Sequence, residues 1–255
     1  MKLSVSLTNY SWADRLHDHL RSLAGLLDDT AVDTLWVPDH LLQADPASRL
    51  DEPMLEAYTA LGYLAAATSR IRLGAMVTAA TFRAPALLIK AVTTLDVLSA
   101  GRAWLGIGAG YNGDEARAMG LFLPGNAERF ARMTELLRLA RQMWNGDETP
   151  FHGEYLILED PVGSPRPVTT PRPPVLIGGT GSGAHCGSSP STAMRAICST
   201  CLTAAPRSAD SSTCWTVTVP TSAGRPRRSS APSPPRCTTA RTPGSWSSAV
   251  KAWAS

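Results

Sequence analysis

The stretch from Ile71 to Glu115, IRLGAMVTAATFRAPALLIKAVTTLDVLSAGRAWLGIGAGYNGDE, decides the predicted fold. Two short apolar runs, 71–78 and 103–107, are rich in β-branched or bulky residues, as buried strands are. Between them, leucine and valine recur at helical spacing from Leu87 to Leu98. A strand, a helix and a second strand with short connections form a βαβ unit, and its two strands are parallel.

Polar and glycine residues follow both predicted strands, at Thr78–Arg83 and Gly108–Glu115. The carboxyl ends of parallel strands lie on one side of a sheet, and the ligands of α/β proteins bind on that side. The sequence therefore predicts a ligand site that these two segments form together.

The first 181 residues repeat this unit on both sides of the stretch. Further strands are expected at Lys2–Leu7, Thr34–Val37 and Pro174–Ile177. Helices are expected after a capping Asp14, from about Pro53 to Ala67, and at Glu128–Trp144. Five strands that alternate with helices predict an α/β fold, a TIM (β/α)8 barrel that is incomplete after about five strands.

The overall composition is typical of a soluble globular protein, with 44% hydrophobic and 18% charged residues. No apolar run approaches the ~20 residues that a bilayer-spanning helix needs. The apolar residues near the start end at Leu7, which is too early for a secretory signal. We therefore expect a cytoplasmic protein with neither a membrane nor a nucleic acid as partner.

The net charge of +3 averages two unlike parts. The tail, residues 182–255, holds eight Lys and Arg, one acid and all five cysteines, so the remainder carries a net charge of −4. The tail also has one leucine and one isoleucine among many Ser, Thr, Pro, Arg and Ala. Such a composition cannot bury enough apolar surface to offset chain entropy. We expect a barrel region at 1–181 and a disordered tail at 182–255.

A shift of reading frame explains the tail more simply than a basic or zinc-binding function. A GC-rich gene read out of frame yields this mixture of residues. When the segment from His185 onward is back-translated and read in another frame, amphipathic helical periodicity, acidic residues and a strand-like run return. Our hypothesis is that residues 182–255 are a frameshift product, which resequencing of the locus would decide.

Six segments of the barrel region, in order and at matching spacing, resemble the bacterial luciferase-like monooxygenase superfamily, in particular its deazaflavin-dependent oxidoreductase branch. They are LWVPDHLL (35–42), DEPMLEAYTALGYLAAATSRIRLGAMVT (51–78), FRAPALLIKAVTTLDVLSAGRAWLGIGAGYNGDE (82–115), ERFARMTELLRLARQMWNGD (128–147), FHGEYLILEDPVGSPRPV (151–168) and PRPPVLIGGTG (171–181).

The resemblance implies a catalytic role for His40 and a coenzyme contact for Asp39, because this pair ends the second strand. Histidine titrates near neutral pH, so it suits a reaction that moves a proton as well as a hydride. The resemblance also implies that Met76, Val77 and Thr78 form a bulge against the coenzyme ring, often with a cis peptide bond that does not involve proline.

Two further loops carry coenzyme-contacting residues in the family. In this chain they correspond to Ala109, Gly110, Asp114 and Glu115 after the fourth strand, and to Gly178, Gly179, Thr180 and Gly181 after the fifth. Glycines there allow backbone N–H groups to approach a phosphate. The sugar-phosphate dehydrogenases of the branch carry a catalytic glutamate where this chain has Tyr111, so their substrate is not expected here.

The resemblance implies an oxidoreductase that transfers hydride between the 8-hydroxy-5-deazaflavin coenzyme (F-420) and a small organic substrate. One alternative is a monooxygenase that uses reduced FMN and molecular oxygen. A second alternative is an inactive remnant, because a barrel that lacks strands has open edges. Intact relatives commonly form homodimers, so a homodimer is a further expectation from the resemblance.

Other motifs are discounted. The run Gly106–Gly110 lacks the G-x-x-G spacing of a dinucleotide fingerprint. His17 and His19 lie two positions apart on a helix and face different ways. Cys198 and Cys201 have zinc-like spacing without a convincing second pair. No metal site is predicted.

Overall fold

The computed structural model describes residues 2–12, 14–45, 48–179, 194–198 and 215–218. The helices are α1 (Leu16–Asp28), α2 (Ala57–Ala67), α3 (Pro85–Leu98), α4 (Gly113–Met119) and α5 (Asn126–Asn145). The strands are β1 (Leu3–Ser6), β2 (Val32–Val37), β3 (Arg72–Ala75), β4 (Thr78–Ala79), β5 (Ala103–Gly108), β6 (Phe151–His152), β7 (Ile157–Leu158), β8 (Val175–Gly179), β9 (Met194–Cys198) and β10 (Trp215–Thr218).

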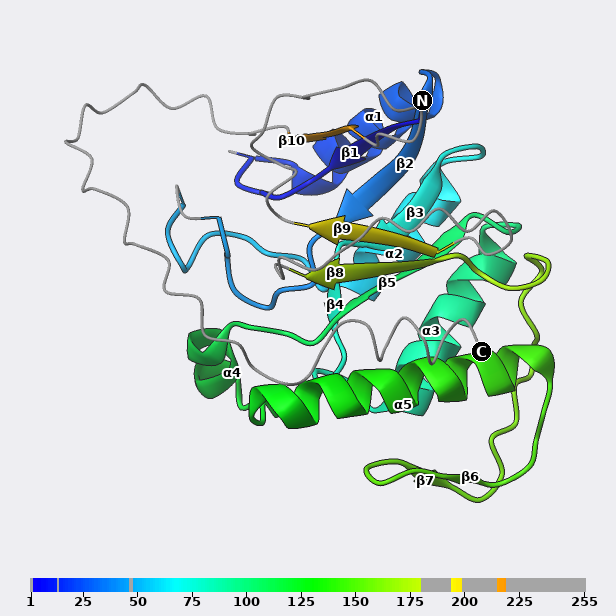
Figure 1. The fold of residues 1–255 in the computed structure, drawn as a ribbon. Coiled ribbons are helices and arrows are strands. Elements are labelled where there is room, and N and C mark those ends of the chain that lie inside the picture. Colours follow the sequence, from blue (N-terminus) through cyan, green and yellow to red (C-terminus); the bar gives the residue numbers. More distant parts are fainter. Residues whose placement is uncertain (1, 13, 46–47, 180–193, 199–214, 219–255) are drawn as a thin grey trace, which may run out of the picture.

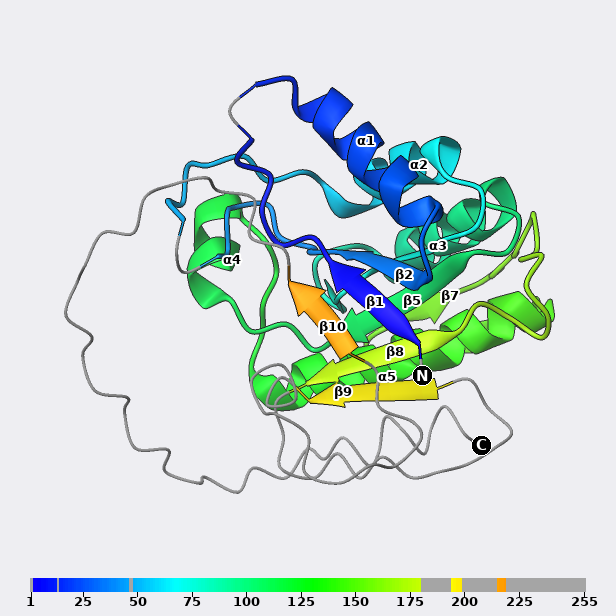
Figure 2. The same ribbon diagram turned by 90° about the horizontal axis from the view of Figure 1, so that it is seen from above.

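One parallel sheet organises the described residues. Its strand order is β10-β1-β2-β3-β5-β8-β9, and β4 also pairs with β5. The sheet is curled, and α1, α2, α3 and α5 cover its outer side (Figures 1 and 2). This arrangement confirms the five predicted strands and the βαβ unit β3–α3–β5. Parallel strands need such crossovers, because the chain leaves one strand at its carboxyl end and must return to the opposite side of the sheet to begin the next.

Alternate residues of the strands pack against the helices and form the outer core. Leu35, Leu73 and Leu105 are fully buried there, as are helix residues such as Leu61 and Leu88. Full burial of a leucine side chain contributes roughly 1.5–3 kcal/mol, so this layer supplies much of the stability. The period of two along each strand then directs the intervening residues to the concave side.

The concave side of the sheet carries a small cluster of large side chains. Trp36 from β2, Trp104 from β5 and Leu176 from β8 are buried together, and the centroids of the two indole rings are 5.6 Å apart. Met76 and Val77 pack against this cluster and are only partly buried. The interior of the curled sheet is therefore filled, and Met76 and Val77 lie on its rim.

The first strand of the predicted βαβ unit, which is the third along the chain, is interrupted and therefore appears as β3 and β4. The Met76–Val77 peptide bond is cis, as the family resemblance implied. Glycines make room for this bulge: a Cβ on Gly108 would lie 2.9 Å from Val77 Cγ2, and one on Gly178 would lie 2.7 Å from it. Glycine at these two positions is therefore a packing requirement, independent of any ligand.

Two predicted helix starts are wrong. Helix α1 begins at Leu16 after Arg15, which makes no capping bond, so Asp14 is not its cap. Helix α2 begins at Ala57 instead of Pro53 because Glu56 caps it, accepting hydrogen bonds from Tyr58 N and Thr59 N. The first backbone N–H groups of α2 are therefore satisfied by Glu56, and those of α1 have no side-chain cap. Helix α4 was not predicted at all.

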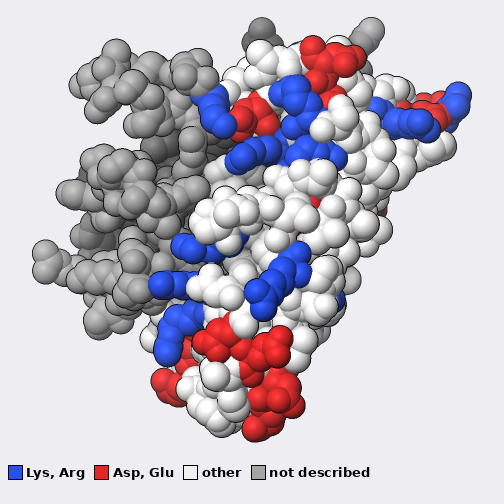
Figure 3. All heavy atoms as spheres, turned by 90° about the vertical axis from the view of Figure 1, so that its right-hand side faces the viewer, with Lys and Arg blue, Asp and Glu red and all other residues white. Residues whose placement is uncertain are grey.

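The excursion between α5 and β8 contains the short β6–β7 hairpin and is anchored by Glu135 of α5. This carboxylate is 8% exposed and accepts hydrogen bonds from Glu154 N, Tyr155 N and Leu156 N. Figure 3 shows the face at the amino ends of the strands, with acidic side chains gathered at its lower end. The exposed acids of this excursion are Asp147, Glu148, Glu154, Glu159 and Asp160.

Beyond residue 181, the described residues are two short strands. β9 pairs with β8, and β10 pairs with β1, both in parallel. The other tail residues, including Cys201, lie outside the described residues, so the division at residue 182 stays a prediction. Among the described residues, no helix is long and apolar enough to cross a membrane.

Asp28, the last residue of α1, holds the turn that leads into β3. Its carboxylate accepts hydrogen bonds from the backbone N–H groups of Ser69, Arg70 and Ile71, at 2.7–2.9 Å. Burial acts to raise the pKa of Asp28, but these donors outweigh it and lower the pKa well below its usual range. The charged form therefore stabilises the folded state.

We predict that Asp28→Asn lowers the free energy of unfolding at pH 7 by about 1.5–3 kcal/mol, the range for hydrogen bonds to charged groups. Because the folded pKa is depressed, this stabilisation is present above the unfolded pKa of about 3.9 and is lost as pH falls through the folded value. Urea unfolding of the parent and the variant at several pH values between 7 and 3 measures how this stabilisation changes with pH. Asp29→Asn, next to it and exposed, is the control; equal effects of both variants would contradict the prediction.

Candidate active site

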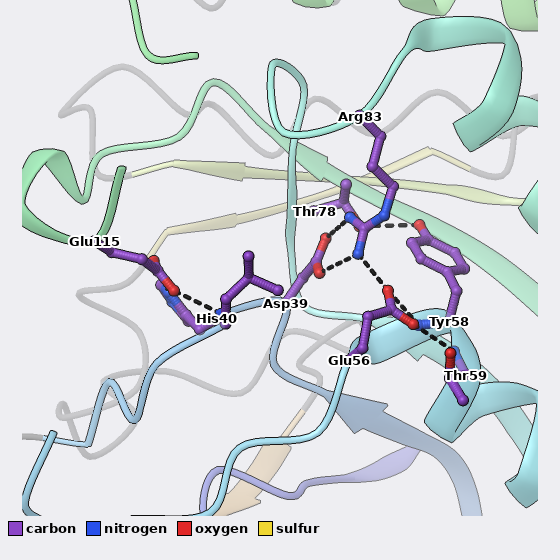
Figure 4. Close-up of polar contacts among 9 residues, drawn as sticks. Asp39, His40, Glu56, Tyr58, Thr59, Thr78, Arg83 and Glu115 are labelled. Atoms are coloured by element: carbon purple, nitrogen blue, oxygen red, sulfur yellow. Dashed lines mark hydrogen bonds and ion pairs between the residues drawn. The ribbon is translucent and has the colours of Figure 1, made fainter. Parts of the chain in front are cut away.

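His40 and Glu115 form a close pair at the carboxyl ends of the strands. His40 follows β2, and Glu115 lies in the first turn of α4, whose cap is Asn112. The distance from His40 Nδ1 to Glu115 Oε2 is 2.7 Å (Figure 4). The side chain of His40 is 17% exposed and that of Glu115 is 1% exposed. A partly exposed histidine is thus hydrogen-bonded to a buried carboxylate.

Backbone hydrogen bonds hold the carboxylate of Glu115 in place. Its Oε1 accepts N–H groups from Leu41 and Leu42 at 2.6 and 3.1 Å. An ionised carboxylate only accepts hydrogen bonds, so the nitrogen of His40 that faces it carries a proton. In the neutral imidazole the lone pair is then on Nε2, on the opposite side of the ring. The pair is therefore arranged for a histidine that accepts and releases a proton at Nε2.

Tyr111, in the β5–α4 loop, lies at that opposite side. Its hydroxyl oxygen is 3.4 Å from His40 Nε2, and the two rings meet edge to face with centroids 5.9 Å apart. The residue is 74% exposed. Desolvation of the hydroxyl and the negative charge of Glu115 raise the pKa of Tyr111 above its usual value. Its hydroxyl therefore stays protonated at neutral pH.

Asp39 points away from His40 and forms a buried ion pair with Arg83. The two Arg83 nitrogens Nη1 and Nη2 lie 2.5 and 2.8 Å from the two carboxylate oxygens. The side chains are 15% and 2% exposed for Arg83 and Asp39. Bidentate arginine–carboxylate pairs are the strong, geometrically specific kind. Both oxygens of Asp39 are thus occupied by Arg83.

A network extends this ion pair to the bulge. Arg83 also lies 2.5 Å from Glu56 Oε1 and stacks 4.8 Å above the ring of Tyr58, whose hydroxyl is 2.9 Å from Thr78 Oγ1 (Figure 4). Burial acts to lower the pKa of Arg83, but Asp39 and Glu56 outweigh it and raise the pKa. Burial raises the pKa of Tyr58, so its hydroxyl stays neutral. The network ties β2, α2, β4 and the loop before α3 together.

The residues predicted to contact a coenzyme divide into two sets. Met76 and Val77 are partly buried on the rim, and Ala109 and Gly110 begin the loop after β5 that leads to Tyr111. Thr78, in contrast, is fully buried and engaged with Tyr58, as Asp39 is with Arg83. In the first set, Met76 and Val77 keep part of their apolar side chains exposed and Ala109 is buried, while the second set is buried in the polar network.

The remaining predicted residues have different surroundings. Asp114 lies on the outer side of α4, with an 89% exposed side chain that pairs with Arg117. Glu115 is directed at His40, as described above. Gly178 and Gly179 end β8, with Gly178 against Val77. Thr180 and Gly181 lie outside the described residues.

Sequence reasoning missed Arg83, Glu56 and Tyr58. A signal was available, because an aspartate that ends a buried strand needs a cationic or hydrogen-bonding partner. The partner is 44 residues away, however, and only the crossover through β3 and β4 brings it to Asp39. Spacing along the chain does not identify it.

We predict that Arg83→Met lowers the free energy of unfolding by about 3–5 kcal/mol, since it leaves the buried Asp39 without a counter-charge. The double variant Arg83→Met with Asp39→Leu should recover much of this loss. Urea unfolding measures both variants. Arg117→Met removes an exposed partner of Asp114 and is the control, with an expected effect below about 1 kcal/mol. An Arg83→Met protein as stable as the control would refute the ion-pair account.

Known proteins have sequences similar to this chain. The chain is 36% identical over 169 residues to a protein of Kineococcus radiotolerans named F420-dependent glucose-6-phosphate dehydrogenase, covering 66% of this chain and 49% of that one. It is 37% identical over 128 residues to an uncharacterized protein of Mycobacterium tuberculosis, covering 50% and 44%. The chain spans about half the length of the curated relatives it matches.

Solved structures share the fold. A monooxygenase of Streptomyces bottropensis superposes with a TM-score of 0.60 at 24% identity, over 70% of this chain and 53% of that one. The F420-dependent tetrahydromethanopterin reductase of Methanopyrus kandleri gives 0.58 at 21%, over 71% and 50%. The model of the luciferase-like monooxygenase family matches residues 1–185. The curled parallel sheet and this match agree, and the chain belongs to the luciferase-like monooxygenase family.

Proposed function

We propose that the protein is an oxidoreductase that transfers hydride between the deazaflavin coenzyme F420 and a small organic substrate. The observation that carries the proposal is the His40–Glu115 pair, placed beside the Met76–Val77 bulge at the carboxyl ends of the strands. The names of the relatives support the same coenzyme. The transfer of a hydride to or from a carbon–oxygen group also moves a proton, and His40 is a group that can hold it.

The residues on the rim fit a flat, tricyclic coenzyme. Met76 and Val77 present partly buried apolar side chains, and these rest on the filled interior of Trp36, Trp104 and Leu176. Gly110 adopts φ +80°, and a Cβ there would lie 3.1 Å from Ala79 Cβ, so glycine suits the loop beside this surface. An apolar support with few polar groups at its edge is typical of cofactor sites. When bound there, F420 would supply the hydride chemistry.

The polar residues of the site would position and move a proton. Glu115 accepts the Nδ1–H of His40, so Nε2 is the ring nitrogen left to take up or release a proton on the side where the substrate would bind. Asp39 is better assigned as a positioning residue than as the coenzyme contact first expected, because Arg83 takes both of its oxygens. Through Asp39, the Arg83 network fixes the end of β2 and hence the backbone of His40.

The identity of the coenzyme is tested by binding. We predict that oxidised F420 raises the melting temperature of the protein in a saturable way, because a ligand that binds only the folded state stabilises it. FMN at the same concentrations is the comparison. Stabilisation by FMN alone would support the monooxygenase alternative, and stabilisation by neither would contradict the proposed function.

A second prediction tests the bulge as the coenzyme surface. Gly178→Ala places a Cβ 2.7 Å from Val77 Cγ2 and 2.8 Å from Cγ1, so Val77 must shift. We expect the dissociation constant for F420 to rise about tenfold, equivalent to about 1.4 kcal/mol. Gly62→Ala, on α2 with nothing within 4 Å of its Cβ, is the matched control and should bind as tightly as the parent. Unchanged affinity in Gly178→Ala would remove Val77 from the site.

A further inference from the structure

The direction of the contact between Tyr111 and His40 follows from their neighbours. Glu115 accepts the Nδ1–H of His40, so the neutral ring has a lone pair at Nε2. The Tyr111 hydroxyl keeps its proton at neutral pH and is therefore the donor at 3.4 Å. Hydrogen bonds of catalytic groups are often this long before substrate binds. Before substrate binds, Tyr111 therefore donates a hydrogen bond to His40, and His40 donates one to the Glu115 carboxylate.

The outer end of this chain of hydrogen bonds is open. Tyr111 is 74% exposed, and its oxygen has lone pairs that His40 does not use. Large exposed aromatic residues are common singly, but this one has its polar end at the catalytic histidine. A substrate group that meets Tyr111 must therefore offer a hydrogen-bond donor to the oxygen. An alcohol hydroxyl has that property.

We propose that Tyr111 is the catalytic residue that exchanges a proton with the substrate oxygen, and that the substrates are small alcohols or the corresponding carbonyl compounds. The hydroxyl of the alcohol donates to Tyr111 Oη, and Tyr111 donates to His40 Nε2. This inference rests on the proposed function, since the hydride needs the oxidised deazaflavin as acceptor. It assigns to a tyrosine the position beside His40 where the family's sugar-phosphate dehydrogenases carry a glutamate.

The step balances as follows. The carbon–hydrogen bond of the alcohol breaks and its electron pair leaves with the hydride to the oxidised deazaflavin, which is reduced. The oxygen–hydrogen bond breaks, and its proton passes to Tyr111 as the proton of Tyr111 passes to His40 Nε2. The alcohol becomes a carbonyl compound, and His40 becomes an imidazolium beside the charged Glu115. The reduction of a carbonyl compound runs through the same steps in reverse.

The contact itself is tested without coenzyme. The imidazole nitrogens of His40 are observed in ¹⁵N-labelled protein by long-range ¹H–¹⁵N spectroscopy and assigned with His40→Asn. We expect a protonated Nδ1, and an Nε2 resonance that moves in Tyr111→Phe, which keeps the ring and removes the hydroxyl. Tyr63→Phe is the matched control, because the Tyr63 hydroxyl donates to the His17 carbonyl on the far side of α2. An Nε2 resonance that does not move in Tyr111→Phe would overturn the proposal.

The relay is tested with the coenzyme present. The reduction of oxidised F420 is followed by its visible absorbance with ethanol, 2-propanol and cyclohexanol as probes. We expect kcat to fall about 100-fold in Tyr111→Phe, within the range for loss of a proton-transfer group, with an unchanged dissociation constant for F420. Tyr63→Phe should react as the parent does.

The outcomes separate the two proposals. If F420 does not bind the parent protein, the proposed function fails, while the nitrogen spectra still decide whether Tyr111 contacts His40. If F420 binds and none of the alcohols reduces it, the assignment of alcohols as substrates is overturned. If the alcohols react equally fast in Tyr111→Phe, the relay is overturned although the coenzyme assignment stands.

Discussion

The buried ion pair of Asp39 and Arg83 is the interaction on which the site depends. An isolated carboxylate at the end of a buried strand would cost several kcal/mol, and the bidentate arginine compensates that cost. Because Arg83 also contacts Glu56 and Tyr58, one guanidinium joins the end of β2, the start of α2 and the loop before α3. The position of His40, one residue after Asp39, follows from this junction.

A second constraint is steric and acts from the opposite side. The bulge at Met76 and Val77 fits only because β5 and β8 carry glycine at positions 108 and 178, where a Cβ would strike Val77. Beneath it, two tryptophans fill the concave side of the sheet. The rim is thus apolar and supported from below, while the polar network lies behind it. In the proposed function, this separation would give a flat ring one face to lie on, with His40 at its edge.

The charges of the site are arranged to leave one proton free to move. Arg83 pairs with both Asp39 and Glu56, so these carboxylates hold the elements of the site in position. Glu115 pairs with His40, and two backbone N–H groups hold it in place. In the proposed reaction, a positive charge on His40 would be stabilised by a carboxylate that is already oriented, which is how preorganised electrostatic catalysis works.

The sequence by itself determined the five parallel strands, because period-two apolar runs, helical spacing between them and short connections allow few other folds. It also placed His40 and the bulge at the carboxyl ends of the strands. It did not reveal that Arg83, 44 residues from Asp39, is its counter-charge, nor that Glu115, 75 residues from His40, faces it. It grouped Asp114 with Glu115, although adjacent helix residues point in different directions. Such pairings were decided by the tertiary structure, since the crossovers of the sheet alone set which strand ends meet.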